Sequence, residues 1–454
     1  MDLKDGVQHT LFTKRDISRL LWPLVVEQIL EVTVGMADVL MVSSVGEAAV
    51  SGVSLVDMIN VLILNIFAAM ATGGAVVVSQ WLGAQEREKA CHTAAQLLTA
   101  AFLLAICIMI LVLIFRSPLL HLFFGPVEPD VMDACLVYFS ISAWSYPFIA
   151  LYNAGAALYR SMGNSRISMY TSIFMNIVNV SGNAICVYGL HMGVAGVAMP
   201  SLVSRFLAAI LMLLLIGSRE NSVYVRYRWS ELRPKALYMK RILHIALPSA
   251  MENSMFQLGR ILVVSIITNF GTTQIAANGV ANNLDNFGCI PGMAINLGII
   301  TVVGRCVGAG DLKQTRYYAK KLMRVCLLCT AALNGIMMLM LPLILGLYSL
   351  SAETMQLTAT LVYIHSGFLI PLYVPAFSIP NVLRAANDVK FPMCISIFSM
   401  WIFRIIFSYI LGIYFGMGAI GVWCAMVADW AFRAICFSVR YFRGRWTKYA
   451  KYRI

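Results

Sequence analysis

Charged residues are scarce in this chain. Asp, Glu, Lys and Arg together make up only 12% of its 454 residues, whereas hydrophobic residues make up 60%. A soluble protein of this length could not cover its surface with so few charges. The scarcity excludes a soluble globular protein, and the mean hydropathy of +0.79 predicts a chain that crosses the bilayer many times.

The groups that polytopic membrane enzymes use for catalysis are also missing. The six histidines are not clustered and no aspartate-rich motif occurs, which disfavours an acyltransferase or a prenyltransferase. The eleven cysteines stand singly in apolar runs, apart from Cys326 and Cys329, which have no second pair. We therefore expect no enzyme, no cofactor and no metal other than a coupling sodium ion. His365 is expected to make an interhelical hydrogen bond, and the long first apolar run predicts no cleavable signal peptide.

What the sequence does contain is a repeat of itself at an offset of 225 residues. Glycine, proline and glutamate positions recur in order: Pro23, Glu27, Gly46, Gly73 and Gly83 return as Pro248, Glu252, Gly271, Gly298 and Gly308. A register held this far predicts two structurally equivalent halves. In polytopic membrane proteins, paired halves are the usual frame for alternating access around a central site. The repeat therefore points to transport.

Twelve apolar runs are long enough to cross a bilayer, which takes about 20 helical residues. The first six lie at 17–43, 52–81, 93–115, 131–158, 165–188 and 193–217, and the second six at 241–269, 274–304, 318–346, 355–383, 389–412 and 417–440. The predicted fold class is an all-α polytopic membrane protein with two pseudo-symmetric six-helix bundles. Its expected domains are an N-terminal lobe (1–218), a basic linker (219–240), a C-terminal lobe (241–442) and a basic tail (443–454).

The basic residues predict the orientation of these spans. With a cytoplasmic N-terminus, inside segments hold 29 of the 34 Lys and Arg, outside loops hold only Arg116, and four arginines fall within spans. This asymmetry follows the positive-inside rule and predicts both termini in the cytoplasm, in a cytoplasmic (inner) membrane. The basic linker is interleaved with aromatic residues, and beneath a membrane that pattern favours lipid headgroup contact over nucleic acid.

Carboxylates inside apolar spans are expensive, at roughly 2.5–3.5 kcal/mol each near a helix centre, and they usually face a cavity or a partner. The first span carries Glu27, Glu31 and Asp38. At 100° per residue, Glu31 and Asp38 lie about 40° and about 20° from Glu27, so we expect all three on one face. Pro23 removes a backbone hydrogen bond from this helix and is expected to let it bend. Asp38 needs a proton, a cation or donors from another helix.

The fifth span offers partners for Asp38. Asn179 and Asn183 stand four residues apart and therefore share a helical face. A carboxylate with amide and hydroxyl oxygens suits a hard cation such as sodium. The same amides could instead hold a protonated Asp38, or could simply join helices by hydrogen bonds.

The second half does not copy this set of residues. Val263 stands at the counterpart of Asp38. Glu252, Arg260 and Asp285 are expected to be cavity residues that meet a ligand or a proton, as is Glu31 in the first half. Asp429 and Arg433 are four residues apart in the last span, and this spacing predicts an intrahelical ion pair.

At these residues the chain resembles the multidrug and toxic compound extrusion (MATE) family. The resemblance covers both halves and rests on the order of weak motifs: Pro23 with Asp38, 46–52, 81–85 with its twin 307–311, Asn179 with Asn183, and 193–198. It implies a V-shaped pair of six-helix bundles that exports amphipathic, often cationic, compounds in exchange for protons or sodium. By motif match, Asp38 is the coupling acid, Asn179 and Asn183 are cation positions, and Ser201 is a hydroxyl position on the sixth helix.

Two departures from the family pattern leave the choice between proton and sodium open. Position 183 is often Asp in the family but is Asn here, and the span 355–383 lacks the acid of some sodium-coupled members. A flippase for lipid-linked or polysaccharide precursors is the main alternative, because it uses a similar scaffold. We expect a monomer that contacts membrane lipids and a small organic substrate.

Overall fold

The computed structural model describes residues 11–125, 128–348 and 350–450. Residues 1–10 of the predicted N-terminal lobe and 451–454 of the predicted tail lie outside the described residues. Every regular element within the described ranges is a helix. The all-α prediction is therefore confirmed for this part of the chain.

The first half contains six long helices. They are α1 (Lys14–Ser43), α2 (Glu47–Gly83), α3 (Arg87–Phe124), α4 (Pro129–Ser161), α5 (Ser165–Ala184, continued by π-helical turns over Ile185–Gly189) and α6 (Ala195–Ile216). Each of them overlaps one predicted span. The predicted linker contains the short helix α7 (Trp229–Leu232), and the next long helix already begins inside the linker.

The second half repeats this order with more irregular helices. The first three are α8 (Ala236–Ile267, with a 3-10 turn over Thr268–Phe270), α9 (Thr272–Gly308) and α10 (Leu312–Gly346). The fourth consists of α11 (Ala352–Tyr373), the π-helical stretch Val374–Ser378 and α12 (Ile379–Ala385). The fifth consists of α13 (Lys390–Ser399) and α14 (Phe407–Tyr409) with the π-helical stretches Met400–Ile406 and Ile410–Tyr414, and the sixth is α15 (Gly418–Phe442). The tail holds α16 (Thr447–Ala450).

The third helix is longer than its apolar run predicts. The expected span ends at residue 115, but α3 continues to Phe124 after a kink at Phe115, where φ is −103° and ψ is 16°. Pro118 explains the kink, because it has no N–H for the carbonyl four residues earlier and its ring crowds that carbonyl. Polar residues beyond the kink interrupt the apolar run, so the run did not predict this last stretch of helix.

Nine helices in the described part of the chain are long and apolar enough to cross a membrane by length and composition. The helices α1, α5 and α8 correspond to predicted spans but are not among these nine. They carry most of the residues selected as site residues, whereas Ser201 lies on α6 and Asp285 on α9. Polar groups such as Glu27, Asn179 and Arg260 contribute to the lower hydropathy of these three helices.

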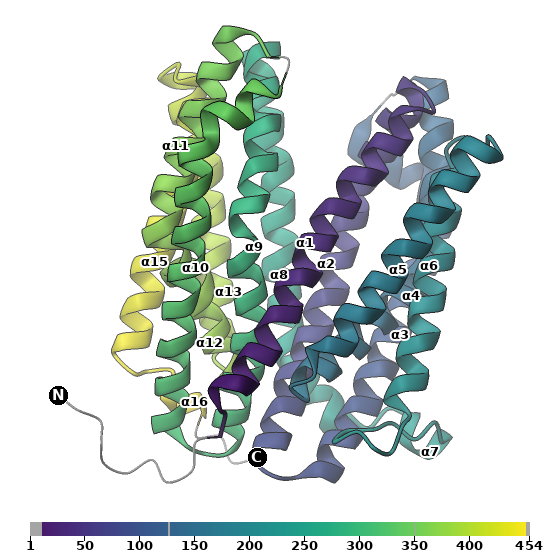
Figure 1. Ribbon diagram of the computed structural model, residues 1–454, viewed down its shortest axis with the longest axis vertical. Helices are drawn as coiled ribbons and strands as arrows, with labels where there is room; N and C mark the ends of the chain where they lie inside the picture. Colours follow the sequence, from purple (N-terminus) through teal and green to yellow (C-terminus); the bar gives the residue numbers. More distant parts are fainter. Residues whose placement is uncertain (1–10, 126–127, 349, 451–454) are drawn as a thin grey trace.

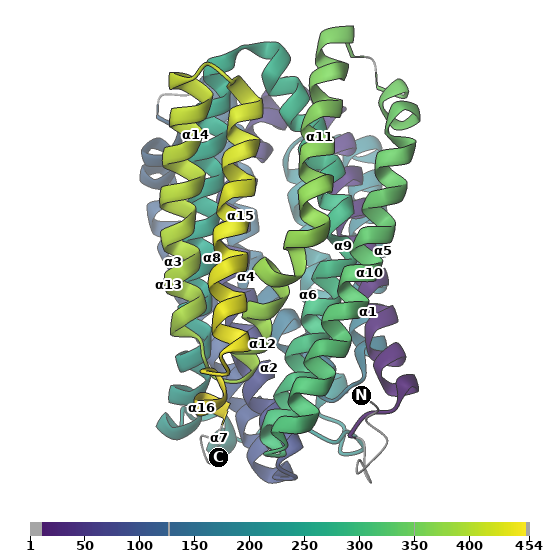
Figure 2. The same ribbon diagram turned by 90° about the vertical axis from the view of Figure 1, so that its left-hand side faces the viewer.

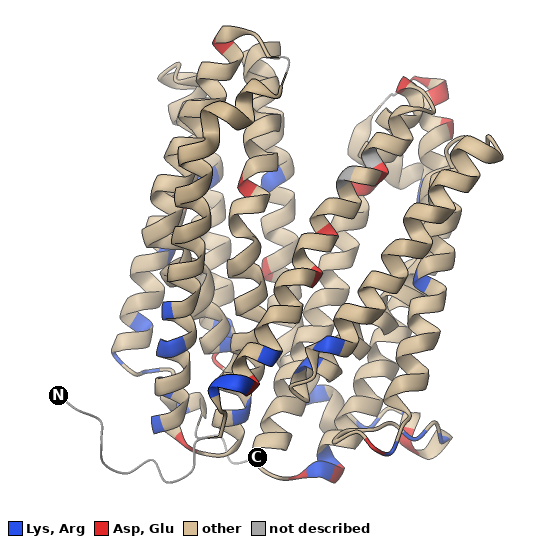
Figure 3. Ribbon diagram, in the orientation of Figure 1, with Lys and Arg blue, Asp and Glu red and all other residues tan. Residues whose placement is uncertain are grey.

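Two six-helix lobes converge at one end of the molecule and diverge at the other, so the predicted V shape is confirmed (Figure 1). In Figure 2 the C-terminal lobe, with α10, α11 and α15, faces the viewer. The converging end holds α7 and α16 and both ends of the described chain. Lys and Arg gather at this end, whereas acidic residues follow α1 toward the other (Figure 3). We call the converging end the basic end.

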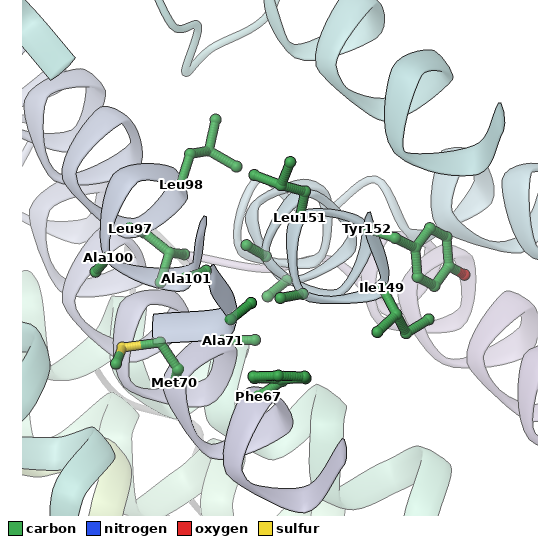
Figure 4. Close-up of a cluster of buried hydrophobic side chains, with 14 of the residues drawn as sticks. Phe67, Met70, Ala71, Leu97, Leu98, Ala100, Ala101, Ile149, Leu151 and Tyr152 are labelled. Atoms are coloured by element: carbon green, nitrogen blue, oxygen red, sulfur yellow. The ribbon is translucent and has the colours of Figure 1, made fainter. Parts of the chain in front are cut away.

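Each lobe has its own apolar core, and the two cores exchange residues at the basic end. In the N-terminal lobe, Phe67 of α2, Leu97 of α3 and Ile149 of α4 belong to one buried cluster (Figure 4). Ile242 and Ile245 of α8 also join that cluster. Their equivalents in the repeat, Ile17 and Leu20 of α1, join the core of the C-terminal lobe instead.

Glycines allow the two lobes to meet closely at the basic end, in contacts that come in pairs. An added Cβ at Gly73 would lie 2.8 Å from Ala246 Cβ, and one at Gly298 would overlap Leu21. Likewise, a Cβ at Gly83 would overlap the backbone of Arg305, and one at Gly308 would overlap the backbone of Gln80. In each pair, the glycine and its contact in one lobe are equivalent, at an offset of 225 residues, to the glycine and its contact in the other lobe. The closed end therefore follows the internal symmetry.

Candidate functional site

The predicted N-lobe residues form one connected chain of hydrogen bonds. Asn183 Nδ2 donates to Asp38 Oδ1 at 2.7 Å and to Asn179 Oδ1 at 2.8 Å. Asn179 Nδ2 in turn donates to Ser201 Oγ at 3.1 Å. Helices α1, α5 and α6 are therefore joined through Asp38, Asn179, Asn183 and Ser201, the four residues that were selected from the sequence as a set.

One oxygen of this chain is left without a partner. Asn183 is fully buried, and its Oδ1 has no hydrogen-bond partner in the described structure. A buried acceptor without a donor is costly, at about 1–3 kcal/mol. Beside the Asp38 carboxylate, it offers the oxygen chemistry that a hard cation or a protonated carboxyl would satisfy.

A second carboxylate, that of Asp57 on α2, belongs to this site, although it was not selected from the sequence. Asn60 Nδ2 donates to Asp57 Oδ1 at 3.2 Å, and the Tyr138 hydroxyl also hydrogen-bonds Asp57. The charge of Asp57 acts on Asp38, and the charge of Arg205 acts on both. Asp57 is the only acid in the predicted span 52–81, and that signal was available in the sequence.

The other two acids of α1 lie in different surroundings. Glu27 is buried, 3.4 Å from Arg160 Nη1, and accepts a hydrogen bond from Ser168 Oγ at 3.1 Å. Glu31 is exposed on its helix and accepts from Gln28 Nε2 at 3.2 Å. Helix α1 continues through Pro23 without a break, so bending at Pro23 stays a prediction.

The C-terminal lobe contains two cavities on which the predicted residues converge. Glu252 lines a cavity of about 250 Å³ and forms an ion pair with Arg384, a residue that the sequence analysis did not select. Arg260 lines a smaller pocket together with Arg404 and Trp423. Glu252 and Arg260 thus line pockets, and their roles toward a ligand or a proton stay predictions.

Asp285 of α9 meets His365 of α11, which agrees with the interhelical contact expected for His365. We expected an interhelical hydrogen bond, and His365 Nε2 of α11 does contact Asp285 Oδ1 of α9. The other ring nitrogen, Nδ1, has no hydrogen-bond partner within the described ranges. The sequence did not indicate which helix would supply the carboxylate.

The predicted ion pair in α15 is present and has an additional partner. Arg433 Nε donates to Asp429 Oδ1 at 2.8 Å, and Arg404 Nη1 lies 3.7 Å from Asp429 Oδ2. Asp429 is fully buried. It therefore links α15 to the π-helical stretch after α13 and neutralises part of the charge of two arginines.

We expect Asp429→Asn to destabilise the protein strongly, because it would remove the buried carboxylate that contacts both Arg404 and Arg433. Breaking such a pair costs about 3–5 kcal/mol. The midpoint of thermal unfolding in detergent should fall accordingly. The matched control is Glu86→Gln, which removes an exposed pair with Lys89 worth about 0–1 kcal/mol. Equal midpoints for the two variants would contradict this account of Asp429.

One protein-family model, described as MatE, matches the chain twice, over residues 23–185 and 248–410. The two matched segments are displaced by 225 residues, the offset of the sequence repeat. Among curated proteins, the chain is 29% identical to the uncharacterized transporter YisQ of Bacillus subtilis, over 90% of each chain. It is 25% identical to the probable multidrug resistance protein NorM of Thermotoga maritima, over 96% of this chain and 94% of the relative.

Solved structures share the fold. An outward-facing multidrug resistance MATE family transporter of the MOP superfamily superposes with a TM-score of 0.88 at 20% identity, covering 96% of this chain and 97% of the other. A MOP superfamily transporter from Pyrococcus furiosus, whose binding pocket is described as having reverse polarity, gives the same TM-score, identity and coverage. At this identity the likeness concerns the fold alone.

Proposed function

We propose that the chain exports amphipathic cations in exchange for protons or sodium ions. It belongs to the MatE family of membrane transporters, because one family model matches both of its halves in the same register. It is a multidrug-efflux type of transporter and not an enzyme. The observation that carries the proposed exchange is the hydrogen-bonded chain from Asp38 to Ser201. In it, Asn183 contacts Asp38 through Nδ2, and its Oδ1 has no partner within the described structure.

We propose that Asp38 is the residue that takes up the coupling ion. A proton would neutralise its carboxylate directly, whereas a sodium ion would also use Asn183 Oδ1 and further oxygens of the N-lobe site. In both cases the charge on Asp38 is cancelled. Cancelling it lowers the cost of removing water from the N-lobe, so α1 can repack around Pro23 and favour release of the bound compound.

We propose that the two lobes alternate between conformations in which the basic end is open or closed, so that this end is the cytoplasmic gate. The concentration of Lys and Arg at that end supports a cytoplasmic location for it and for both termini (Figure 3). The paired glycine contacts support a gate that is shut in the present conformation. Rocking of the lobes about this end would open the site to each side of the membrane in turn.

The distribution of acids and arginines in the two lobes favours a cationic substrate over the pyrophosphate-linked substrate of a flippase. The N-lobe presents Glu31, Asp38 and Asp57, whereas three C-lobe arginines are in contact with acids: Arg384 with Glu252, and Arg404 and Arg433 with Asp429. The larger C-lobe cavity adds the aromatic rings of Phe256, Tyr373 and Phe377, which can stack on an organic cation. The chain is proposed to act as a monomer among membrane lipids.

Efflux of a fluorescent organic cation from proteoliposomes tests the proposed exchange and identifies the ion. Vesicles are given a proton gradient alone, a sodium gradient alone, or neither, and ionophores that dissipate each gradient serve as controls. We expect one of the two gradients to accelerate efflux relative to vesicles without a gradient. Efflux that neither gradient accelerates would contradict the antiport mechanism.

A further inference from the structure

Three side chains with metal-binding atoms converge in the C-terminal lobe, away from the N-lobe site. Asp285 and Cys289 stand one helical turn apart on α9, and His365 comes from the neighbouring α11. Their ligand atoms, a carboxylate oxygen, a thiol sulfur and an imidazole nitrogen, all lie within 4.8 Å of one another. In a tetrahedral zinc site, ligand bonds of 2.0–2.3 Å place neighbouring ligand atoms about 3.4 Å apart, so small rotamer changes suffice.

His365 is buried, and the only charged group it contacts within the described residues is a member of this cluster. The side chain is only 1% exposed, and the Trp423 and Trp430 rings pack edge-on against it, with centroids at 5.8 and 5.1 Å. Its Nε2 pairs with Asp285 Oδ1, whereas its Nδ1 has no hydrogen-bond partner among the described residues. Cys289 Sγ also approaches Asp285 Oδ1, at 3.5 Å. The imidazole and the thiol thus both face one oxygen of Asp285, so all three ligand atoms point to the same place.

We propose that Asp285, Cys289 and His365 bind a borderline-soft divalent cation, Zn²⁺ in particular, that bridges α9 and α11. Mixed oxygen, sulfur and nitrogen ligands suit Zn²⁺, whereas sodium and magnesium prefer oxygen alone. Binding requires the Cys289 thiol to release its proton to solvent. The carboxylate and the thiolate then cancel the charge of the ion, which lowers the cost of holding it inside the membrane. Water would complete the coordination.

Arg260 distinguishes a metal site from a plain ion pair. Its positive charge acts on both Asp285 and Cys289, and its side chain is exposed. The guanidinium therefore favours an empty site with a charged Asp285 and opposes a second cation. Removing the guanidinium should therefore strengthen metal binding at this site. If the three side chains only form hydrogen bonds with one another, removing it should not change metal binding.

Co²⁺ is a suitable probe, because a thiolate ligand gives it a charge-transfer absorption that oxygen and nitrogen ligands do not. The full-length protein, purified in detergent with its affinity tag removed, is titrated with Co²⁺ and then with competing Zn²⁺. We expect one equivalent of Co²⁺ to give this absorption and Zn²⁺ to displace it. Cys289→Ser should abolish the absorption, and His365→Asn should weaken binding at least as much as loss of an outer-shell partner, roughly 10- to 100-fold. Arg260→Gln should tighten it.

Matched variants separate this site from adventitious binding and from the transport mechanism. Cys329→Ser removes an exposed cysteine on α10 and should leave the absorption unchanged. Asp38→Asn should retain Co²⁺ binding even where transport is lost, so each proposal can fail independently. All variants are checked for monodispersity by size-exclusion chromatography. No charge-transfer absorption in the unmodified protein, or an unchanged one in Cys289→Ser, would overturn the proposal.

Discussion

Asp38→Asn is expected to eliminate coupled exchange while leaving the protein folded. The substituted amide is nearly the same shape as the carboxylate, and its oxygen can still accept the hydrogen bond that Asn183 Nδ2 donates at 2.7 Å. What it cannot do is change its charge by binding a proton, or neutralise a sodium ion. Because coupling energies between two ligands typically correspond to factors of roughly 5 to 150, gradient-driven efflux should fall by that factor or more.

Proteoliposome efflux and equilibrium drug binding should therefore respond differently to this substitution. Binding of the fluorescent cation without a gradient should persist in Asp38→Asn, because the cavities of the C-terminal lobe are intact. Asp133→Asn is the matched control, since Asp133 is exposed near the start of α4, and its efflux should equal that of the unmodified protein. Gradient-driven efflux that survives in Asp38→Asn would contradict the role assigned to this carboxylate.

The helices and their pairing could be predicted because both leave a direct trace in the sequence. Membrane spans are long apolar runs, and the 225-residue repeat was visible at glycine and proline positions such as Gly83 and Gly308. The structure explains why glycine stands at both positions, because a side chain at either one would overlap the backbone of the opposite lobe. The extension of α3 beyond Phe115 was missed because Arg116, Pro118 and His121 interrupt the apolar run.

The candidate site was only partly predictable, because most of its partners are distant in the sequence. Asp38, Asn179 and Asn183 were selected from their positions in apolar spans, Ser201 was selected through the family resemblance, and the structure joins all four. Glu252 and Arg384 are 132 residues apart, and no local pattern links them. The same holds for Asp285 and His365. Asp429 with Arg433 could be predicted, because a spacing of four residues brings side chains together on any helix.

Gly83→Val and Gly308→Val are each expected to open the basic end. A Cβ at either position would overlap the backbone of the other lobe, at Arg305 or at Gln80, and a backbone carbonyl cannot move aside as a flexible side chain can. The lobes must separate there, and overpacking of this kind typically costs about 1–3 kcal/mol. Since about 1.4 kcal/mol changes an equilibrium tenfold, the closed conformation should lose roughly one to two orders of magnitude in population relative to the open one.

Spin labels at Glu88 and Lys313 would measure this opening directly. Both positions are exposed at the basic end, near the starts of α3 and α10, and they are equivalent in the repeat. The labels are attached to introduced cysteines in a chain whose eleven native cysteines are replaced and that retains transport. Each valine variant should lengthen the distance between the labels and slow efflux. Gly335→Val is the control, because a Cβ there meets nothing within 4 Å.

The double variant tests whether the two glycine contacts belong to one closed interface. Once the first valine has separated the lobes, the second residue no longer faces the opposite backbone, so its own cost should largely disappear. The population shift in the double variant should therefore be clearly smaller than the sum of the two single shifts, as for residues that share one structural change. Additive shifts would mean that the two contacts open separately, and the basic end would then not act as a single gate.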